Sequence, residues 1–554
     1  MPETTPPRYY ITTPIYYVND RPHIGHCYTT VVADVAARAA RLLGRDTFFL
    51  TGTDEHAEKV TARAAEQNLP VREWADRNAL AFRAAFAALG CSHDDFIRTS
   101  EDRHKDRAAR CIGALLERRD TELGQSEGWF DPSQEEYVTE NAAREHDYLS
   151  PVSGKPLERR AEENYFFRLD RYQDRLLGAL ESGELGVLPE ARRNEVLARV
   201  RQGLQKVPVS RRIKDDEPDD VRRWGVLMPG DPQHRVYVWI EALLNYVTAI
   251  ETDERRRYWP ATVHLIAKDI LWFHAVIWPA MLMALGRGLP GLVYAHAYYI
   301  AEGRKMSKSL GNFIEIDTLE RYAQRYSVDA LRWFLATQGP LGSTDADFAH
   351  ARFVEIYNAE LANGIGNAAS RVGNMIDKYF GGAVPDHRGT LAGEGFDWPA
   401  LTRDAAASFG AALDRFAVDE AVREGLALAS RVDQYINATR PFSIAKAIDK
   451  GEADDPASER DRLGAILYQC AEALRVAGLL LWPAMPFKMS ALWETWGCAP
   501  WREPSDPSSG FAAPLEELAR FAGPHGLTPG RPLSKGEPLF MRADDDQPAP
   551  NARP

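Results

Sequence analysis

The sequence has few cysteines, and they are scattered. It contains five in 554 residues, and none of them forms a C-x-x-C pair. A disulfide framework or a cysteine-based zinc site is therefore not expected, and isolated thiols suit a reducing compartment. The five are Cys27, Cys91, Cys111, Cys470 and Cys498.

The sequence also lacks an obvious membrane or export signal. No apolar run is long enough, on inspection, to cross a bilayer. Residues 9–15 already predict a strand, which leaves no room for a cleaved leader before the fold begins. We therefore expect a cytoplasmic protein that makes no membrane contact.

Positive charge is in deficit. The chain has 67 Lys and Arg against 80 Asp and Glu, which gives a net charge of −13. This balance argues against a protein that coats nucleic acid nonspecifically. A basic cluster within residues 192–212 is compatible with RNA binding through one local face, but a solvated helix face explains it equally well.

The chain begins with the pattern of a doubly wound α/β domain. Residues 9–15 form a β-branched and aromatic run, residues 28–43 have helical periodicity and end at Gly44, and residues 47–50 form a second apolar run closed by Gly52. Strand, turn, helix and strand in this order predict a parallel sheet. Further strands are expected at 236–239, 263–266 and 292–296.

Composition divides the chain into five parts. A polar, turn-rich stretch interrupts the α/β pattern, and apolar residues at three- and four-residue spacings predict a helix bundle after Phe348. The predicted parts are the α/β domain in two halves (1–116 and 224–347), an insertion (117–223), the all-α bundle (348–500) and a C-terminal extension (501–554), whose end from Ala543 is expected to be disordered.

The first candidate motif is His23-Ile24-Gly25-His26. It lies where a strand gives way to a helix, and a helix N-terminus offers N–H groups and a positive dipole to phosphate. The two histidines are three residues apart and share one face, while Gly25 leaves space for a flat ring. Alone, an H-x-G-H pattern is weak, because paired surface or core histidines are common.

The second candidate motif is Lys305-Met306-Ser307-Lys308-Ser309. Two lysines in a loop of small residues can close over a triphosphate and stabilise the charge that develops in phosphoryl transfer. An exposed basic loop would explain this segment equally well if it stood alone. Both motifs occur in this order at predicted strand ends, and this combination makes coincidence remote.

Together the two motifs resemble the signatures of the class I aminoacyl-tRNA synthetases. Other segments narrow the resemblance to the methionyl family, and it extends from residue 9 to about 493 with an echo at 537–540. It implies a Rossmann-type catalytic domain, an inserted connective domain and a helical anticodon-binding domain. The further segments are 12–19, 51–56, 193–196, 237–240, 268–270, 273–274 and 278–282.

The resemblance implies a ligase that uses ATP, with accompanying Mg²⁺, to join L-methionine to tRNA(Met) through methionyl-adenylate, and so supports initiation and elongation of translation. It also assigns roles to residues of this chain. The catalytic residues would be His23, His26, Lys305 and Lys308, and the other ATP-binding residues Gly25, Lys268, Asp269, Met306, Ser307 and Ser309.

A methionine pocket also follows from the resemblance. Asp54 would accept the α-ammonium group in a charge-assisted contact, and aromatic faces would contact the thioether. Without the resemblance, residues such as Trp239 or His274 would be taken for core. The expected pocket residues are Ile15, Tyr17, Asp54, Trp239, Ala242, Tyr246, Ile270, His274 and Ile277.

The helical domain carries the predicted anticodon site, at Asn437, Arg440 and Phe442. The family usually has Trp where this chain has Phe442. An aromatic face can still stack on an unpaired base, which stabilises binding by roughly 1–3 kcal/mol. The alternative is that Phe442 is a hydrophobic anchor at a helix start.

The chain departs from the family pattern in several places. The insertion has no cysteine between 125 and 164, which resembles the zinc-free branch that includes mitochondrial-type enzymes, so no zinc is expected. Ala57, Ala267 and Ala297 replace the family's usual Gly, and Glu241 replaces its Asp. An added methyl in a tight site costs on the order of 1–3 kcal/mol, so substrate affinities are open to change.

Three other functions compete with this interpretation. One is a class I synthetase for another amino acid, although the insertion is too small for the editing domain of the leucine, isoleucine and valine enzymes, and the cysteine enzymes hold a zinc. The second is a noncatalytic paralogue that binds tRNA or protein. The third is an enzyme that makes the adenylate but charges another acceptor. We expect a monomer, because the appended C-terminal domain of dimeric relatives is missing.

Overall fold

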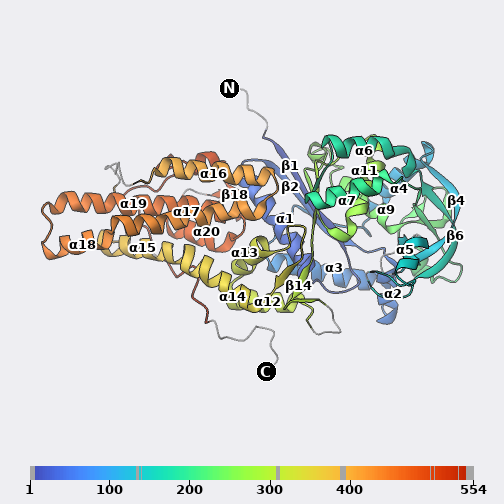
Figure 1. Cartoon of the computed structure of the whole chain (residues 1–554), viewed down its shortest axis with the longest axis horizontal. Helices are drawn as coiled ribbons and strands as arrows, with labels where there is room; N and C mark the ends of the chain where they lie inside the picture. The colour runs from blue at the N-terminus through green and yellow to red at the C-terminus, as the bar shows by residue number, and fades with distance from the viewer. Residues whose placement is uncertain are drawn as a thin grey trace.

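The structure is a computed structural model with an α/β body and an elongated helical arm (Figure 1). The two parts meet along helix α1 (Ile24–Leu42), which contacts helices α16 (Trp398–Asp414) and α17 (Val418–Thr439) of the arm. The residues that the structure describes are 6–132, 136–138, 140–151, 153–306, 312–386, 395–498, 501–503, 506–534 and 536–544.

The α/β body is built on a parallel sheet. Among the described residues, six strands pair in the order β3-β2-β1-β12-β13-β7, and each pairing is parallel. The predicted doubly wound class is confirmed. The strands are β1 (Arg8–Tyr17), β2 (Asp46–Asp54), β3 (Asp95–Arg98), β7 (Gly186–Leu188), β12 (Val263–Ala267) and β13 (Leu292–His296).

Burial on both faces explains the composition of these strands. Tyr9 to Pro14 of β1 are fully buried, as expected of a parallel strand covered by helices on both sides. Helix α1 (Ile24–Leu42) returns across β1 and β2 and is buried along most of its length. The other helices of this body are α2 (Glu58–Glu66), α3 (Val71–Ala88), α4 (Asp102–Glu117), α9 (Val238–Leu243), α10 (Asn245–Thr248), α11 (Trp278–Ala284), α12 (Ile316–Tyr326) and α13 (Val328–Gln338).

Two predicted strand assignments need correction. The run at 236–239 is not a strand of the sheet: β11 (Asp231–Val236) ends there, and Val238 opens helix α9. Short apolar runs fit a buried helix as well as a strand. The second strand does not close at Gly52 but continues to Asp54. A Cβ at Gly52 would lie 2.0 Å from the carbonyl oxygen of Ile97, so this glycine permits close strand pairing.

The segment 117–223 holds a second, antiparallel sheet in the order β5-β4-β6-β8. It also supplies β7, which pairs with β13 at the edge of the main sheet. The predicted domain limits remain predictions. The elements are β4 (Thr121–Asp131), β5 (Glu136–Val138), α5 (Glu140–Glu145), β6 (Glu158–Phe167), η1 (Leu169–Tyr172), α6 (Gln173–Ser182), α7 (Glu190–Arg201), β8 (Val207–Pro208), β9 (Ser210–Arg212) and α8 (Asp219–Arg222), followed by β10 (Leu227–Met228).

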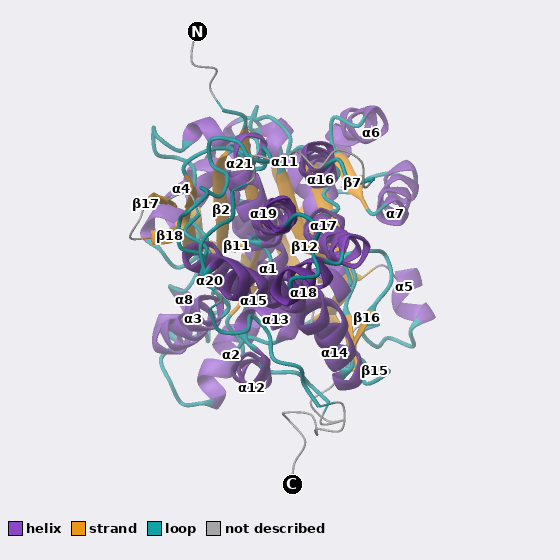
Figure 2. Ribbon diagram, turned by 90° about the vertical axis from the view of Figure 1, so that its left-hand side faces the viewer, coloured by secondary structure: helices purple, strands orange, loops and turns teal. Residues whose placement is uncertain are grey.

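The chain after Phe348 is helical, as predicted. Figure 2 views the arm end-on, with α15, α17, α18 and α19 bundled in front of the sheet. Its helices are α14 (His350–Ile356), the π-helix η5 (Tyr357–Gly366), α15 (Asn367–Phe380), α16 (Trp398–Asp414), α17 (Val418–Thr439), α18 (Pro441–Lys450), α19 (Pro456–Leu481) and α20 (Pro486–Thr495).

Helix α19 corrects the expectation that no segment reaches membrane-spanning length. It has 26 residues, and by length and composition alone its most apolar 18-residue window could span a membrane. However, 94% of that window is buried inside the protein. Such burial is typical of the central helix of a bundle, and α19 contacts α15, α16, α17, α18 and α20.

The C-terminal extension forms a hairpin, β17 (Trp501–Glu503) and β18 (Asp506–Phe511), and a short helix, α21 (Leu515–Leu518). The chain then returns to η5. The Tyr357 hydroxyl donates to the carbonyl of Met541 at 2.7 Å, and Asn358 and Ala543 exchange two hydrogen bonds of 3.0 and 2.9 Å. The expected disorder from Ala543 onward falls mostly on 545–554, outside the described residues.

Candidate functional site

The histidine motif caps the N-terminus of α1. His23 Nδ1 accepts from the backbone N–H of Gly25 at 3.1 Å, and His26 Nδ1 accepts from that of His23 at 3.3 Å. Because each Nδ1 accepts, each neutral ring carries its proton on Nε2. Burial, together with His23 and Lys59, holds the pKa of His26 well below its usual value. The pair can therefore offer uncharged N–H donors at a helix N-terminus.

The segment after the lysine motif is bonded to the histidine motif. The backbone N–H of Ile24 donates to the carbonyl of Ile314 at 3.0 Å, and that of Ile316 donates to Pro22 at 3.3 Å. The two motifs are 279 residues apart in sequence, yet the chain that follows the lysine motif forms backbone hydrogen bonds with the histidine motif and its neighbour Pro22.

Two members of the lysine motif are described. Lys305 lies exposed in strand β15 (Arg304–Lys305), and its carbonyl accepts from Asn312 Nδ2 at 3.2 Å. Met306 is half-buried. Ser307, Lys308 and Ser309 lie outside the described residues.

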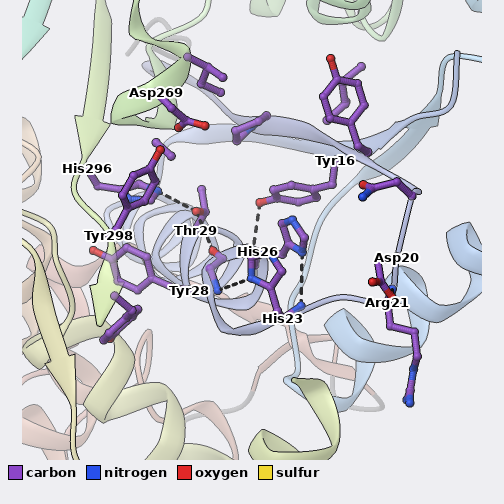
Figure 3. Close-up of a pocket in the computed structure, with 18 of the residues that line it drawn as sticks. Tyr16, Asp20, Arg21, His23, His26, Tyr28, Thr29, Asp269, His296 and Tyr298 are labelled. Atoms are coloured by element: carbon purple, nitrogen blue, oxygen red, sulfur yellow. Dashed lines mark hydrogen bonds between the residues drawn. The ribbon is translucent and has the colours of Figure 1, made fainter. Parts of the chain in front are cut away.

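A cavity of about 480 Å³ opens above the histidine motif (Figure 3). This volume lies within the range of small-molecule sites. The predicted ATP residues His23, Gly25, His26 and Asp269 line it. So do two of the replaced glycine positions, Ala267 and Ala297, and the rest of the lining is Pro14, Ile15, Tyr16, Tyr17, Asn19, Asp20, Arg21, Tyr28, Thr29, Lys59, Trp239, Ile270, His296, Tyr298, Tyr299 and Phe313.

Lys268 does not line this cavity. Its ammonium group pairs with Asp345 at 2.6 Å and lies over the ring of Tyr298. Asp345 also accepts from the backbone N–H of Tyr298 at 2.9 Å. Lys268, predicted to bind ATP, therefore contacts Tyr298, which lines the cavity, and does not itself face the cavity.

Sequence reasoning missed a polar pair in this cavity. Thr29 Oγ1 lies 2.7 Å from His296 Nε2, and His296 Nδ1 lies 2.7 Å from the carbonyl of Ala297 (Figure 3). The carbonyl can only accept, so Nδ1 carries the proton and Nε2 accepts from Thr29. Burial lowers the pKa of His296 to about 4. Thr29 is one helical turn beyond His26, and His296 ends β13, so helical spacing and the strand-end rule could have found both.

Lys59 was also missed. It lies on α2 just after the 54–56 segment, lines the large cavity, and its ammonium nitrogen stands 3.5 Å from the centre of the Tyr17 ring. A cation over an aromatic face is attracted to it. Lys59 therefore places positive charge in the large cavity, next to Tyr17, which also belongs to the predicted methionine residues.

The predicted methionine residues converge on a second, much smaller cavity of about 30 Å³. Eight of the nine line it; Ile277 is buried nearby and lines a different cavity. The small cavity shares Pro14, Ile15, Tyr17, Trp239 and Ile270 with the large one, so the two adjoin. Its lining is Pro14, Ile15, Tyr17, Asp54, Trp239, Ala242, Leu243, Asn245, Tyr246, Ile270 and His274.

The base of this small cavity is a fixed hydrogen-bond chain. The Tyr246 hydroxyl lies 2.8 Å from His274 Nε2, and His274 Nδ1 lies 3.0 Å from the carbonyl of Ile270. Nδ1 is thus the donor, and Nε2 accepts from the phenol. Burial lowers the pKa of His274 to about 4, although the bond to Ile270 opposes it. His274 is therefore neutral near pH 7, and the wall presents no cation to a thioether.

Asp54 is the carboxylate of the small cavity. It ends β2, is 2% exposed, and accepts from Thr99 Oγ1 at 3.3 Å and from the backbone N–H of His56 at 3.4 Å. A buried carboxylate at a cavity wall is suited to binding a cationic group.

The predicted anticodon residues lie together where α17 gives way to α18, the helix labelled in the outer part of the helical arm (Figure 1). Arg440 is the left-handed residue, with φ of 49°, that joins α17 to α18. Asn437 and Arg440 are exposed, and Phe442 is 43% exposed. Such exposure suits a stacking surface better than a hydrophobic anchor.

No group of three or more His, Cys, Asp or Glu side chains is placed to hold a metal ion within the described part of the chain. The question of zinc stays a prediction, because 133–135, 139 and 152 of the insertion lie outside that part.

Comparison with known proteins shows which family this chain is similar to. A family model described as "tRNA synthetases class I (M)" matches residues 9–146 and 143–373. The methionine–tRNA ligase of Caldanaerobacter subterraneus is 40% identical over 88% of this chain and 74% of its own length. That of Streptomyces coelicolor is 39% identical over 97% of both, and that of Bacillus subtilis 37% identical over 97% of this chain and 78% of its own.

Solved structures agree. Mycobacterium tuberculosis methionyl-tRNA synthetase in complex with methionyl-adenylate is similar with a TM-score of 0.85 and 33% identity, over 97% of this chain and all of that one. Its unliganded form is similar with a TM-score of 0.80 and 30% identity, over 98% of this chain and 99% of that one.

Proposed function

The chain belongs to the methionyl branch of the class I tRNA synthetases, a methionine–tRNA ligase family, and from this premise we propose how its two adjoining cavities perform the reaction. The large cavity binds ATP and the small one the side chain of L-methionine. Their shared wall at Ile15, Tyr17 and Trp239 places the methionine carboxylate beside the α-phosphate.

One observation carries this proposal. The backbone bonds of Ile24 to Ile314 and of Ile316 to Pro22 hold the chain next to the lysine motif against the histidine motif. Lys305 and Lys308 precede Ile314 by nine and six residues in the sequence, and we propose that they act on the triphosphate with Met306, Ser307 and Ser309. His23 and His26 act from the opposite side.

The first step is adenylate formation. A carboxylate oxygen of methionine attacks the α-phosphorus of ATP, the bond from that phosphorus to the β-phosphate oxygen breaks, and pyrophosphate leaves. Nε2–H groups of His23 and His26 donate to phosphate oxygens and stabilise the charge that builds up there. Gly25 and Asp269 hold the adenosine, with Lys268 and its partner Asp345 behind. The protein supplies no nucleophile, so its contribution is positioning and electrostatics.

Methionine selection follows from the small cavity. Asp54 binds the α-ammonium group, and Trp239, Tyr246 and His274 surround the thioether. A cavity of about 30 Å³ has room for roughly one or two water molecules, so lining side chains move when methionine enters. Trp239, which lines both cavities, stacks on Phe273 with ring centres 4.1 Å apart. Ile277 supports the wall from behind.

The second step transfers methionine to the terminal ribose of tRNA(Met). A ribose hydroxyl attacks the carbonyl carbon of the adenylate, the bond to the phosphate breaks, and AMP leaves. Asn437, Arg440 and Phe442 read the anticodon at the junction of α17 and α18. In Figure 1, α18 lies in the outer part of the arm, away from α1 with its histidine motif, which suits a ligand that reaches both regions.

Mg²⁺ enters with ATP, held largely by the phosphates, and no step above depends on a protein ligand for it. We further propose that the enzyme holds no zinc and acts as a monomer in the cytoplasm. The apolar window of α19 is enclosed by protein, which supports a chain that makes no membrane contact.

The test is methionine-dependent aminoacylation of tRNA(Met) by the purified chain, with pyrophosphate exchange for the first step. His23→Asn keeps a capping acceptor for α1 but removes the Nε2–H donor, and should slow exchange about 100-fold or more. Lys305→Ala should also slow it, whereas Lys378→Ala, an exposed lysine on α15, should not.

Three outcomes would overturn the assignment. Leucine outperforming methionine in exchange would indicate another class I synthetase. Tight tRNA binding without AMP release would indicate a noncatalytic protein. Charging that ignores the CAU anticodon would indicate a different acceptor.

A further inference from the structure

A carboxylate and two imidazoles meet in the interior behind the small cavity. Glu241 is fully buried, and its Oε1 lies 2.7 Å from His56 Nδ1. Its Oε2 lies 3.4 Å from His104 Nε2, on α4. His56 is 5% exposed and His104 fully buried. None of the three lines the large or the small cavity, and the reaction described above uses none of them.

Glu241 and His56 lie behind the small cavity, on two different segments that supply lining residues to it. Glu241 lies on α9, whose residues Trp239 and Ala242 share one face and line that cavity. His56 follows Asp54 by two residues, just past the end of β2. The contact between Glu241 Oε1 and His56 Nδ1 therefore joins the side-chain wall of the cavity to the segment that carries its carboxylate.

The segment from Asp54 to His56 has little freedom to move. The backbone N–H of His56 donates to Asp54 Oδ1 at 3.4 Å. Trp224 Nε1 donates to the carbonyl of Glu55 at 2.6 Å, and the Trp224 and His56 rings pack at right angles with centres 5.3 Å apart. A displacement of His56 would thus be passed directly to the Asp54 carboxylate.

The third member anchors the cluster to the same wall. His104 Nδ1 lies 3.4 Å from Thr248 Oγ1, which donates to the carbonyl of Leu244 at 2.9 Å, directly after α9. Burial raises the pKa of Glu241, but His56 and His104 outweigh it and bring that pKa to about 2. Glu241 is therefore an anion at neutral pH, and it attracts both imidazoles.

We propose that Glu241 is a positioning residue for the amino acid: through His56 it fixes the spacing between the Asp54 carboxylate and the Trp239–Ala242 wall. Methionine, with an ammonium group at one end and a thioether at the other, reaches from one wall to the other and needs that spacing. ATP binding does not depend on the spacing, because Asp54 and Ala242 do not line the large cavity. The inference rests on the proposed role of Asp54 in binding the α-ammonium group.

The experiment compares Glu241→Ala, Glu241→Asp and wild-type enzyme by calorimetric binding and by pyrophosphate exchange. Loss of a buried bond to a charged group predicts that the Kd for methionine rises about 10-fold or more in the alanine variant. Aspartate keeps the charge and should restore affinity to within about threefold. The KM for ATP should stay within about twofold in both.

Two methionine analogues distinguish positioning from general damage. Methioninol keeps the ammonium group and the thioether, so Glu241→Ala should weaken it as much as methionine. Deaminated methionine, 4-(methylsulfanyl)butanoate, does not need Asp54, and its weak affinity should be nearly unchanged. Equal losses for both analogues, or parallel losses for methionine and ATP, would overturn the proposal, as would an alanine variant that binds methionine like the wild type.

Two further variants complete the design. If Glu241→Ala does not fold, Glu241→Gln keeps an acceptor for His56 but removes the charge, and should weaken methionine alone by about 3- to 10-fold; an unchanged Kd would refute the inference. Asp54→Asn tests the premise. If it leaves methionine affinity intact, the proposed role of Asp54 fails; if it weakens methionine while the Glu241 variants do not, only the positioning role of Glu241 fails.

Discussion

Replacing Arg332 by methionine should loosen the joint between the helical arm and the helix that carries the histidine motif. Arg332 lies on α13 and is fully buried. Its guanidinium donates to Asp34 on α1 at 2.7 Å and to the carbonyls of Leu89, Pro483 and Ala484 at 3.0, 2.9 and 3.1 Å. One side chain therefore joins α1, the end of α3 and the turn between α19 and α20.

The expected cost is large because every partner is buried. Removing one member of a buried ion pair destabilises a protein by about 3–5 kcal/mol when the remaining charge loses its partner. Asp34 keeps Arg38 at 2.9 Å, so the lower end of this range applies, and three buried carbonyls lose their donor as well. Methionine fills similar space but cannot donate to the three carbonyls. As a control, Arg175 pairs with Glu184 at 2.6 Å while both side chains are about half exposed. Breaking an exposed pair costs about 0–1 kcal/mol.

The assay is urea unfolding followed by tryptophan fluorescence, together with the KM for ATP in pyrophosphate exchange. We expect Arg332→Met to lower the free energy of unfolding by about 3 kcal/mol or more. It should also raise the KM for ATP, because α1 begins at the histidine motif. Arg175→Met should change neither. Similar unfolding midpoints for the two variants would refute this reasoning.

Four other predictions follow from the site. Phe442→Ala should weaken tRNA(Met) binding by roughly 1–3 kcal/mol and leave methionine activation unchanged; equal tRNA affinity would contradict a stacking role. Ala267→Gly removes a methyl group from the large cavity and should lower the KM for ATP by at most about 10-fold, measured by exchange; a higher KM would contradict it. His274 and His296 have pKa values of about 4 in the folded protein, below the unfolded value, so stability should be complete above about pH 6.5 and fall towards pH 4, by on the order of 3 kcal/mol for each; pH-independent unfolding would contradict this. Elemental analysis of the purified chain should find no zinc, and one zinc per chain would refute that prediction.

Local patterns were sufficient for much of the fold and the site. The β-branched and aromatic run of β1, the change from strand to helix at the histidine motif and the helical periodicity after Phe348 are set by near neighbours, and all three are confirmed. The convergence of Asp54, Trp239 and His274 was predicted from motif resemblance, since no local rule places residues more than 180 positions apart.

The failures have a common physical cause. Val238 opens a helix although its neighbours suit a strand, because tertiary burial decides between the two for a short apolar run. The partners of Glu241 and Arg332 could not be predicted from the sequence either. A charged residue is expected at the surface, and only the folded chain shows which distant groups compensate its burial. Ile277 and Lys268 lie next to the predicted cavities but not in their walls, because helix rotation and a distant aspartate set where they point.

The return of residues 536–544 to η5 has a practical consequence for anyone who handles this enzyme. Leu539 and Phe540 are nearly fully buried against the helical arm. A shortened chain that stops before residue 536 would therefore expose the apolar surface that they cover and would be prone to aggregate. A purification tag joined beyond residue 544 would leave the contacts of residues 536–544 with η5 intact.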